Sequence, residues 1–280
     1  MQLFSYKNNF IAQLTGLYGK DEAEQLFYML SEEFLGFTKV EIALEAQKEL
    51  TPTELDQFNQ ALKRLKNYEP IQQIIGKAYF YGNDFMVNQF TLIPRPETEE
   101  LVDWIIEENR NKEINILDIG TGTGCIAISL AQNLPNAKVA AIDISNEALK
   151  IAKKNAKQIS VSVNFQQQDI LNATSFTGNL DVVVSNPPYV RNLEKDMMSA
   201  NVLNYEPATA LFVSDEDPLL FYRKIAQLFL AEAKTEAILY FEINEYLAKE
   251  LKKLLRNLGF QSVEVRKDFR GKNRMLKATL

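Results

Sequence analysis

Apolar residues recur every three or four positions through the amino-terminal quarter of the chain. In the stretch TPTELDQFNQALKRLKN, this spacing places Leu55, Phe58, Leu62 and Leu65 on one face of a helix. The opening letters TPTE combine a capping box with a proline that suits the first helical turn. Because EAEQLFYMLSEEFL and KVEIALEA show the same periodicity, we predict a small all-helical domain over residues 1–73.

The pattern changes in residues 74–94, where glycine and aromatic residues mark the stretch IIGKAYFYGNDFMVNQFTLIP. This composition predicts a β-hairpin that links two domains. The next stretch, PRPETEELVDWIIEENR, has a proline suited to a first helical turn and acidic residues that complement the positive end of a helix dipole. We therefore predict that a second domain, residues 95–280, begins with a helix.

Beyond residue 113, short apolar runs alternate with amphipathic stretches. This alternation predicts an α/β architecture, in which helices cover both faces of a parallel sheet. The predicted strands are residues 114–118, 138–142, 163–167, 181–185, 236–242, 261–267 and 274–280. The predicted helices of this region are residues 125–132, 146–157, 217–233 and 245–257.

Composition narrows the possible chemistry. Of the 280 residues, 46% are hydrophobic and 24% are charged, which is ordinary for a soluble protein of about two domains. The chain has no apolar run long enough to span a membrane and no signal-peptide pattern at its first residues, so we expect a cytoplasmic protein. It contains no histidine and one cysteine, Cys125, which excludes an internal disulfide, a Ser/His or Cys/His catalytic pair and a histidine-based metal site. We expect no metal cofactor.

The net charge of −6 argues against broad electrostatic binding to nucleic acid or to anionic lipid. We therefore expect neither a nucleic-acid substrate nor a membrane partner. The stretch VRKDFRGKNRMLK is locally basic, and it is either a solvated hairpin or a surface that docks a partner. Its basic residues are Arg266, Lys267, Arg270, Lys272, Arg274 and Lys277.

A glycine-rich corner follows the first predicted strand of the α/β region. The stretch INILDIGTGTGCIAISLA runs from a buried strand through Gly120, Gly122 and Gly124 into a helix. Glycines here let the backbone turn tightly and let a ligand lie against amides at the helix amino terminus. Asp143 ends the next strand, where a carboxylate can accept both hydroxyls of a ribose. The GxGxG spacing differs from the dinucleotide fingerprint GxGxxG, so we predict an adenosine-type site, with simple strand-to-helix packing as the alternative.

The stretch FQQQDI supplies a third element of this predicted site. Asp169 ends the third strand and could accept a hydrogen bond from an adenine amino group, while Ile170 could lie against the ring. A surface aspartate that merely follows a strand is the alternative.

The stretch DVVVSNPPYV ends the fourth strand in a stiff corner. Pro187 and Pro188 have fixed φ angles and no N–H, so the Asn186 side chain and the Pro187 carbonyl are held as two acceptors without a local donor. A planar NH2 group fits between them, and the ring of Tyr189 can stack on it. When such a nitrogen attacks a methyl group its hydrogens become more acidic, so both bonds strengthen in the transition state. An ordinary strand-ending turn is the alternative.

In a doubly wound sheet, the loops that follow the first and fourth strands face each other across the ligand crevice. The sequence therefore predicts that the GTGTG loop and the NPPY corner form one site.

Four stretches together resemble the HemK/PrmC family of release-factor glutamine N5-methyltransferases: IPRPETE at 93–99, LDIGTGTG at 117–124, AIDIS at 141–145 and SNPPYV at 185–190. The resemblance extends over essentially the whole chain. It implies a Rossmann-like class I methyltransferase domain with a seven-stranded mixed sheet, joined by a β-hairpin to an amino-terminal helical domain that recognises the substrate. NPPY alone is shared with adenine-N6 methyltransferases, whereas IPRPETE combined with NPPY is more specific.

By this likeness the methyl donor is S-adenosyl-L-methionine, the product is S-adenosyl-L-homocysteine, and the acceptor is the glutamine of the Gly-Gly-Gln motif in class 1 peptide release factors. The implied cofactor-binding residues are Gly120, Thr121, Gly122, Thr123, Gly124, Asp143, Asp169, Ile170 and Asn186. The implied substrate-binding residues are Asn186, Pro187, Pro188 and Tyr189, of which Asn186, Pro187 and Tyr189 are the implied catalytic residues. We expect a monomer.

The chain departs from the family pattern at two places. Ile170 stands where the family often has an aromatic residue, and FEINEY at 241–246 lacks the glycine usual after that strand, so we assign FEINEY no role. Arg95 and Glu97 could line the site or simply begin a helix. Glu206 could approach the acceptor or serve as a buried structural carboxylate.

Two other functions remain open. A nucleic-acid adenine-N6 methyltransferase would use the same corner but needs a basic channel for phosphates. A non-enzymatic nucleotide-binding module would dock a partner through the helical domain.

Overall fold

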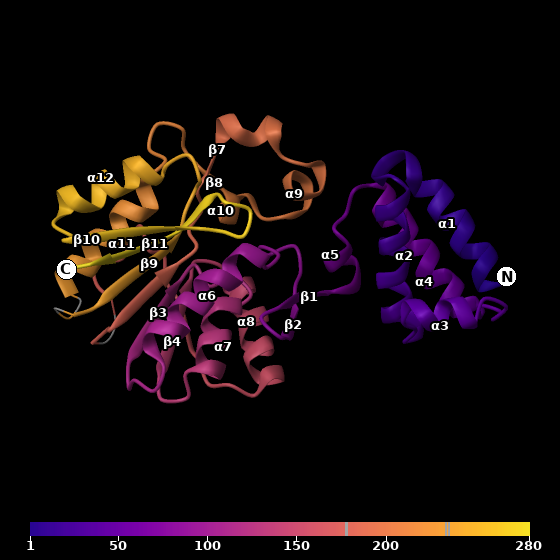
Figure 1. The fold of residues 1–280 in the computed structure, drawn as a ribbon, viewed down its shortest axis with the longest axis horizontal. Helices are drawn as coiled ribbons and strands as arrows, with labels where there is room; N and C mark the ends of the chain where they lie inside the picture. The colour runs from indigo at the N-terminus through magenta and orange to yellow at the C-terminus, as the bar shows by residue number, and fades with distance from the viewer. Residues whose placement is uncertain (177–178, 233, 235) are drawn as a thin grey trace. The chain divides into compact units, whose positions relative to one another are not determined.

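The computed structural model describes residues 1–176, 179–232, 234 and 236–280 (Figure 1). These residues form two compact units. One consists of Met1–Gly76 together with Ser199–Tyr205, and the other of Lys77–Met198 together with Glu206–Leu280. Within these ranges, no helix is long and apolar enough to cross a membrane.

The smaller unit is helical, as predicted. The TPTE capping box forms at its fourth helix: the Thr51 hydroxyl accepts from the Glu54 N–H (3.3 Å), and the Glu54 carboxylate accepts from the Thr51 N–H (2.7 Å). Phe10, Phe27 and Phe58 are fully buried at the centre of the unit. Its helices are α1 (Leu3–Tyr18), α2 (Lys20–Leu35), α3 (Lys39–Leu44), α4 (Pro52–Lys66), α5 (Ile71–Ile75) and α9 (Ala200–Tyr205).

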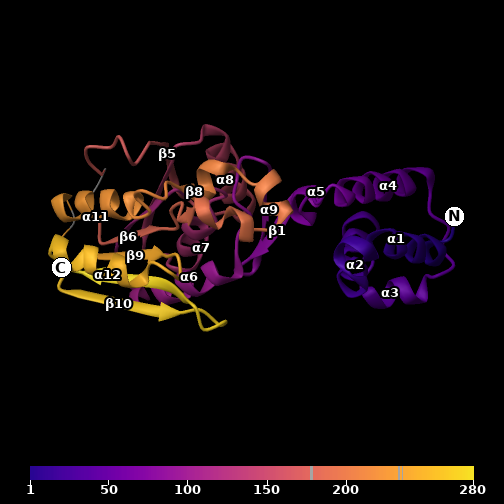
Figure 2. The ribbon, with the colours of Figure 1, turned by 90° about the horizontal axis from the view of Figure 1, so that it is seen from above.

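Helix α9 joins this unit although it lies far along the chain (Figure 2). The hydroxyl of Tyr205 donates to the carbonyl of Asn67 at 2.9 Å. The side-chain amide of Gln73, in α5, donates to the carbonyl of Tyr205, also at 2.9 Å. Ser199–Tyr205 therefore belongs to the helical unit, whereas the residues before and after it in the chain belong to the larger unit.

The larger unit is built on a mixed sheet, which in the described residues has seven strands in the order β10-β11-β9-β6-β3-β4-β5. The strands from β9 to β5 are parallel, whereas β11 is antiparallel to both of its neighbours. The strands are β3 (Asn115–Ile119), β4 (Lys138–Asp143), β5 (Asn164–Gln167), β6 (Val182–Ser185), β9 (Ile238–Glu242), β10 (Ser262–Lys267) and β11 (Asn273–Thr279). This confirms the α/β prediction, and each predicted strand agrees within two residues at either end.

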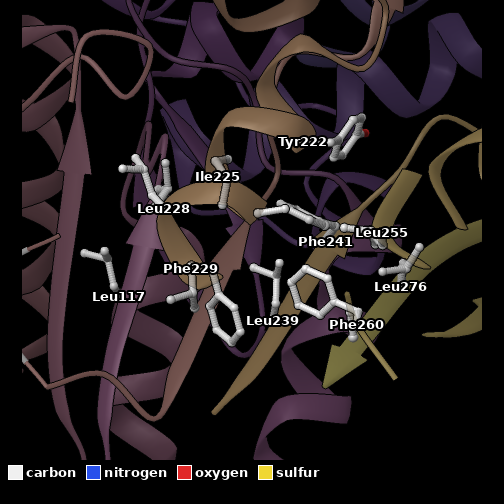
Figure 3. Close-up of a cluster of buried hydrophobic side chains, with 14 of the residues drawn as sticks. Leu117, Tyr222, Ile225, Leu228, Phe229, Leu239, Phe241, Leu255, Phe260 and Leu276 are labelled. Carbon is white, nitrogen blue, oxygen red and sulfur yellow. The ribbon is translucent and has the colours of Figure 1, made fainter. Parts of the chain in front are cut away.

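Helices cover both faces of this sheet, as the alternating pattern predicts. Successive residues of β9 point to opposite faces: Leu239 and Phe241 pack in one core, and Tyr240 packs in the other. Figure 3 shows the first core, where Phe229 and Phe260 lie near Leu239. The helices of this unit are α6 (Pro96–Asn109), α7 (Cys125–Asn133), α8 (Asn146–Ile159), α10 (Ala208–Leu211), α11 (Leu220–Glu232) and α12 (Ala248–Leu258). Residue 233, the last of the helix predicted over 217–233, lies outside the described residues.

The predicted hairpin forms as β1 (Lys77–Phe80) and β2 (Asn83–Met86), which pair antiparallel. Its aromatic residues Phe80 and Phe85 are fully buried in the second core of the larger unit. The side chain of Asn155, in α8, both accepts from the Met86 N–H (2.8 Å) and donates to the Met86 carbonyl (3.1 Å). The hairpin is thus packed firmly onto the domain that follows it.

The segment after the NPPY corner contains short elements that the sequence pattern did not predict. They are β7 (Val190–Arg191), the 3-10 helix η1 (Asn192–Met197), α9, α10 and β8 (Phe212–Val213). Strands β7 and β8 pair parallel in a separate small sheet.

Candidate active site

The two predicted loops begin at the carboxyl ends of neighbouring strands. In the parallel pair of β3 and β6, Ile119 and Ser185 are register partners, and the Ser185 hydroxyl donates to the Ile119 carbonyl at 2.7 Å. The chain winds from β3 toward β4 on one side and returns to β6 on the other. Such a reversal of winding opens a crevice at the carboxyl ends of the strands. The GTGTG loop and the NPPY corner therefore start side by side, as predicted.

The glycine loop uses backbone conformations that favour glycine. Gly120, Gly122 and Gly124 have φ angles of +75°, +56° and +83°. A Cβ atom added to Gly124 would lie 2.8 Å from the Cδ1 atom of Ile128, whereas at Gly120 or Gly122 it would meet no atom within 4 Å. Gly124 thus permits close packing of α7, and the other two glycines leave open space beside the loop.

Asp143, at the end of β4, is connected to this loop. One carboxylate oxygen accepts from the Gly122 N–H (2.8 Å), and the other accepts from the Ser145 N–H (2.8 Å). Burial raises the pKa of Asp143, while these backbone donors lower it in part. The carboxylate is therefore fixed at the mouth of the glycine loop, with lone pairs left for further donors.

Asp118, in β3, is a candidate site residue that the sequence analysis missed. It is completely buried, and its Oδ2 atom accepts from the Thr121 hydroxyl at 2.6 Å. Its Oδ1 atom accepts no hydrogen bond of normal geometry from the described part of the chain. Burial raises the pKa of Asp118 to about 7, assisted by the charge of Asp143, although the Thr121 hydroxyl and the Ala127 N–H lower it. An unpaired buried acceptor is rare, which makes Asp118 a candidate to accept a hydrogen bond from a ligand. Only its position inside the LDIGTGTG motif could have drawn attention to it.

The two threonines of the loop are both buried, at 5% exposure for Thr121 and 2% for Thr123. The Thr121 hydroxyl donates to Asp118 at 2.6 Å, and the Thr123 carbonyl accepts from the Asn155 side-chain amide at 2.9 Å. Both threonines therefore brace the loop from within.

The third predicted element is arranged as a turn after β5. The Asp169 carboxylate accepts from the Leu171 N–H (2.9 Å) and from the Asn172 side-chain amide (2.6 Å). Ile170 is buried in the first core, in the cluster that includes Phe176. Among the described residues, no group of three acidic or thiol side chains gathers as a metal site would require.

The NPPY corner presents two free acceptors. The Asn186 side chain forms no hydrogen bond with any residue that the structure describes. The carbonyl of the buried Pro187 likewise accepts none from this part of the chain. Tyr189, by contrast, is anchored, because its hydroxyl donates to Glu242 at 2.9 Å. The corner can thus accept two hydrogen bonds from a planar NH2 group.

Other candidate residues have structural partners. Glu206 is buried at 5% exposure and accepts from the Ile93 N–H (3.0 Å) and from Arg95 (2.5 Å), which is the arrangement of a structural carboxylate. Glu97 lies in the first turn of α6 and pairs with Arg270 at 3.4 Å.

The basic stretch near the carboxyl end is largely neutralised within its own unit. Acidic partners lie within 4 Å of five of its basic side chains. These side chains are Arg266, Arg270, Lys272, Arg274 and Lys277. The arrangement favours the solvated hairpin over a surface that docks an acidic partner.

Comparison with known proteins gives consistent matches. Residues 8–76 match the PrmC N-terminal domain, and residues 98–212 match the methyltransferase small domain. The chain is 47% identical to a release factor glutamine methyltransferase of Flavobacterium psychrophilum, over 99% of both chains. It is 44% identical to a protein of the same name from Bacteroides thetaiotaomicron, over 95% of both chains.

Solved structures share the fold at low sequence identity. The hMettl16 catalytic domain superposes with a TM-score of 0.59 at 17% identity, covering 91% of this chain and 90% of that one. A methyltransferase from Pyrococcus furiosus gives a TM-score of 0.52 at 20% identity, covering 79% of this chain and 97% of that one. The larger unit therefore has the Rossmann-like class I methyltransferase fold.

Proposed function

The chain belongs to the family of release factor glutamine methyltransferases, and from that membership we propose its reaction in detail. The enzyme transfers a methyl group from S-adenosyl-L-methionine to the side-chain nitrogen, N5, of the glutamine in the Gly-Gly-Gln motif of class 1 peptide release factors. S-adenosyl-L-homocysteine is the second product, no metal takes part, and the enzyme acts as a monomer in the cytoplasm.

One observation carries this proposal: the free Asn186 and Pro187 acceptors lie beside the glycine loop, at the ends of two paired strands. A glutamine side chain ends in a planar NH2 group whose two hydrogens match two acceptors. The corner thus fits the acceptor group that the family acts on.

The groups around the glycine loop fit S-adenosylmethionine. The open space at Gly120 and Gly122 allows a ligand to approach the backbone, and Asp143 has lone pairs for the ribose hydroxyls. The unpaired Asp118 Oδ1 would accept from the ammonium group of the methionine part. Asp169 would accept from the adenine amino group, with Ile170 beneath the ring.

When bound, S-adenosylmethionine supplies a methyl group on a positively charged sulfur, which is reactive enough that alignment largely determines the rate. Asn186 and Pro187 accept hydrogen bonds from the glutamine nitrogen and aim its lone pair at the methyl carbon. These bonds strengthen as the nitrogen acquires positive charge, so they stabilise the transition state more than the ground state. The methylated nitrogen carries a positive charge and is strongly acidic, so it would release one of its two protons to water and become the neutral N-methyl amide. A strong base is therefore unnecessary, which suits a chain without histidine.

The ring of Tyr189 stacks on the flat carboxamide and favours positive charge near its face. Burial and the adjacent Glu242 raise the pKa of Tyr189, so the phenol remains a neutral hydrogen-bond donor.

The helical unit recognises the release factor. This proposal is motivated by its separate core and by its match to the PrmC N-terminal domain. We expect removal of residues 1–72 to raise the Michaelis constant for the release factor at least about tenfold, the value of one lost hot spot. A truncated protein that melts normally, binds the donor normally and keeps its Michaelis constant would contradict this role.

The experiment that tests the reaction uses labelled donor with release factor, with DNA and with RNA in parallel. We expect label in the release factor alone, mapped by mass spectrometry to the glutamine. Label in nucleic acid alone would instead support the adenine-N6 alternative, although the neutralised hairpin offers no channel for phosphates.

A further inference from the structure

Two residues at the end of β9 hold the tyrosine of the NPPY corner at both of its ends. The Tyr189 hydroxyl donates to Glu242 Oε1 at 2.9 Å. The Asn244 side-chain amide donates to the Tyr189 backbone carbonyl at 3.0 Å. Glu242 and Asn244 are exposed by only 1% and 5%. The FEIN segment, residues 241–244, therefore fixes both the side chain and the peptide group of Tyr189.

Glu242 also contacts the IPRPETE stretch. Its second oxygen, Oε2, accepts from the hydroxyl of the buried Thr98 at 2.5 Å. Its backbone carbonyl accepts from the Tyr222 hydroxyl at 3.1 Å, which fixes the end of the strand. A carboxylate with one donor on each oxygen cannot rotate without losing a hydrogen bond.

These contacts favour the charged form of the buried Glu242 carboxyl group. Burial raises the pKa of Glu242, whereas the hydroxyls of Thr98 and Tyr189 and the positive charge of Arg274 lower it. Burying a carboxyl group is unfavourable unless its lone pairs are satisfied. Here both side-chain partners belong to the IPRPETE and NPPY stretches, so the carboxylate links these two motifs.

Asn244 continues the network toward the segment after the corner. Its amide nitrogen also lies 3.1 Å from Glu194 Oε2, and Glu194 accepts from both the N–H and the side chain of Arg191 at 2.9 Å. Asn244 thus connects the Tyr189 carbonyl to Glu194, which binds the backbone N–H two residues later.

We propose that Glu242 is a positioning residue that acts through Tyr189 to keep the Asn186 and Pro187 acceptors aligned with the substrate nitrogen. The proposal rests on the proposed function. The two prolines between Asn186 and Tyr189 have fixed φ angles, so the backbone between these residues is stiff. The orientation of Tyr189 therefore determines the orientation of the Asn186 and Pro187 acceptors. Glu242 itself needs no contact with either substrate.

The first test is Glu242→Gln, which keeps the size of the side chain and removes its charge. We expect kcat on release factor to fall about tenfold or more, because a misplacement of about 1 Å costs up to about 100-fold. We expect the Michaelis constants for donor and release factor to change less than about twofold, because the lost alignment matters mainly in the transition state. An unchanged kcat would overturn the proposal.

The second test is a double-mutant cycle with Tyr189→Phe, which removes the hydroxyl and keeps the ring. Tyr189→Phe alone should lower kcat with unchanged Michaelis constants. Adding Glu242→Gln to it should lower kcat by less than about twofold more, because both changes break the same contact. Multiplicative losses in the double variant would overturn the proposal, as would an unchanged kcat in Tyr189→Phe. The kcat of Tyr189→Phe alone therefore tests the proposal even if Glu242→Gln does not fold.

Glu108→Gln is the matched control. Glu108 is a partly buried carboxylate that, like Glu242, accepts from a tyrosine hydroxyl, that of Tyr240 at 2.6 Å, but it bonds no residue of the corner. We expect this variant to keep the wild-type kcat. Amide exchange measured over residues 182–198 should be faster in Glu242→Gln than in wild type and unchanged in Glu108→Gln.

Amide exchange tests the positioning role of Glu242 separately from the proposed methyl-transfer reaction. A wild-type enzyme that does not methylate release factor would overturn the proposed function, while exchange would still report whether Glu242 holds the corner. Equal exchange in Glu242→Gln and wild type would overturn the positioning role even if methylation is normal.

Discussion

The Ser185 hydroxyl donates a 2.7 Å hydrogen bond to the Ile119 carbonyl, at the last register pair of two parallel strands. The glycine loop leaves the sheet one residue after Ile119, and the NPPY corner leaves it one residue after Ser185. This pair therefore fixes the starting points of both loops at the carboxyl ends of two adjacent strands. In the proposed reaction, the methyl donor and the glutamine would be aligned because the two loops that hold them start from hydrogen-bonded neighbours.

Replacing Asn186 tests the acceptor role of the corner. We expect Asn186→Ala to lower methyl transfer by about 100-fold or more, the usual cost of losing a hydrogen bond that strengthens in the transition state. Donor affinity should stay within about threefold, because the side chain bonds nothing in the glycine loop. Single-turnover transfer and calorimetric donor binding measure the two effects. Unchanged transfer would instead favour a nucleotide-binding module.

Replacing Asp143 tests the donor site. Its carboxylate holds the Gly122 N–H and is left with lone pairs for the ribose. We expect Asp143→Asn to weaken S-adenosylmethionine binding about tenfold or more, from the loss of roughly 1.5 to 3 kcal/mol for a hydrogen bond to a charged group. Glu147→Gln is the control, because Glu147 is an exposed carboxylate in the next helix whose one ion-pair partner among the described residues is Lys150. Equal affinity in the two variants, measured by titration calorimetry, would remove Asp143 from the donor site.

Asp118 gives the protein a characteristic pH dependence. Its pKa is raised from 3.8 to about 7 in the folded chain, so between these values the folded chain keeps a proton that the unfolded chain has lost. The free energy of unfolding should therefore fall as pH rises through this window, by up to about 1.4 kcal/mol per pH unit from this group. Asp118→Asn should remove this contribution and stabilise the ligand-free protein at pH 7.

The same substitution should weaken donor binding, because a neutral amide oxygen accepts a weaker hydrogen bond from an ammonium group than a carboxylate does. Urea unfolding at pH 5, 6 and 7 and calorimetry with S-adenosylmethionine measure the two effects. A parallel pH dependence in wild type and Asp118→Asn would contradict the assignment.

The strands and the two loops could be predicted because their signals are local. The buried strand Val182–Ser185 contains three β-branched valines and is followed, after Asn186, by a proline pair. The three glycines of the loop adopt positive φ angles. Capping at Thr51 depends on a residue three positions away. Each of these features is determined by residues that lie within a few positions of one another in the sequence.

Other parts of the site could not be predicted because they depend on distant partners. Tyr205 bonds Asn67, which is 138 residues away, and α9 is too short to show a periodic pattern. The role proposed for the FEIN segment could not be seen in the sequence, because the partner of Glu242, Tyr189, is 53 residues distant. In the sequence, Asp118 is one polar residue within a predicted buried strand, and nothing distinguishes it. Only the structure shows that its Oδ1 atom has no hydrogen-bond partner within the described chain.

The most direct test of the account is a crystal structure of the enzyme with S-adenosylhomocysteine and a peptide that contains the Gly-Gly-Gln motif. We expect the glutamine side-chain nitrogen to lie within about 3.2 Å of both Asn186 Oδ1 and the Pro187 carbonyl oxygen, and to face the sulfur. A nitrogen more than about 4 Å from either oxygen, or an acceptor turned away from it, would contradict the account.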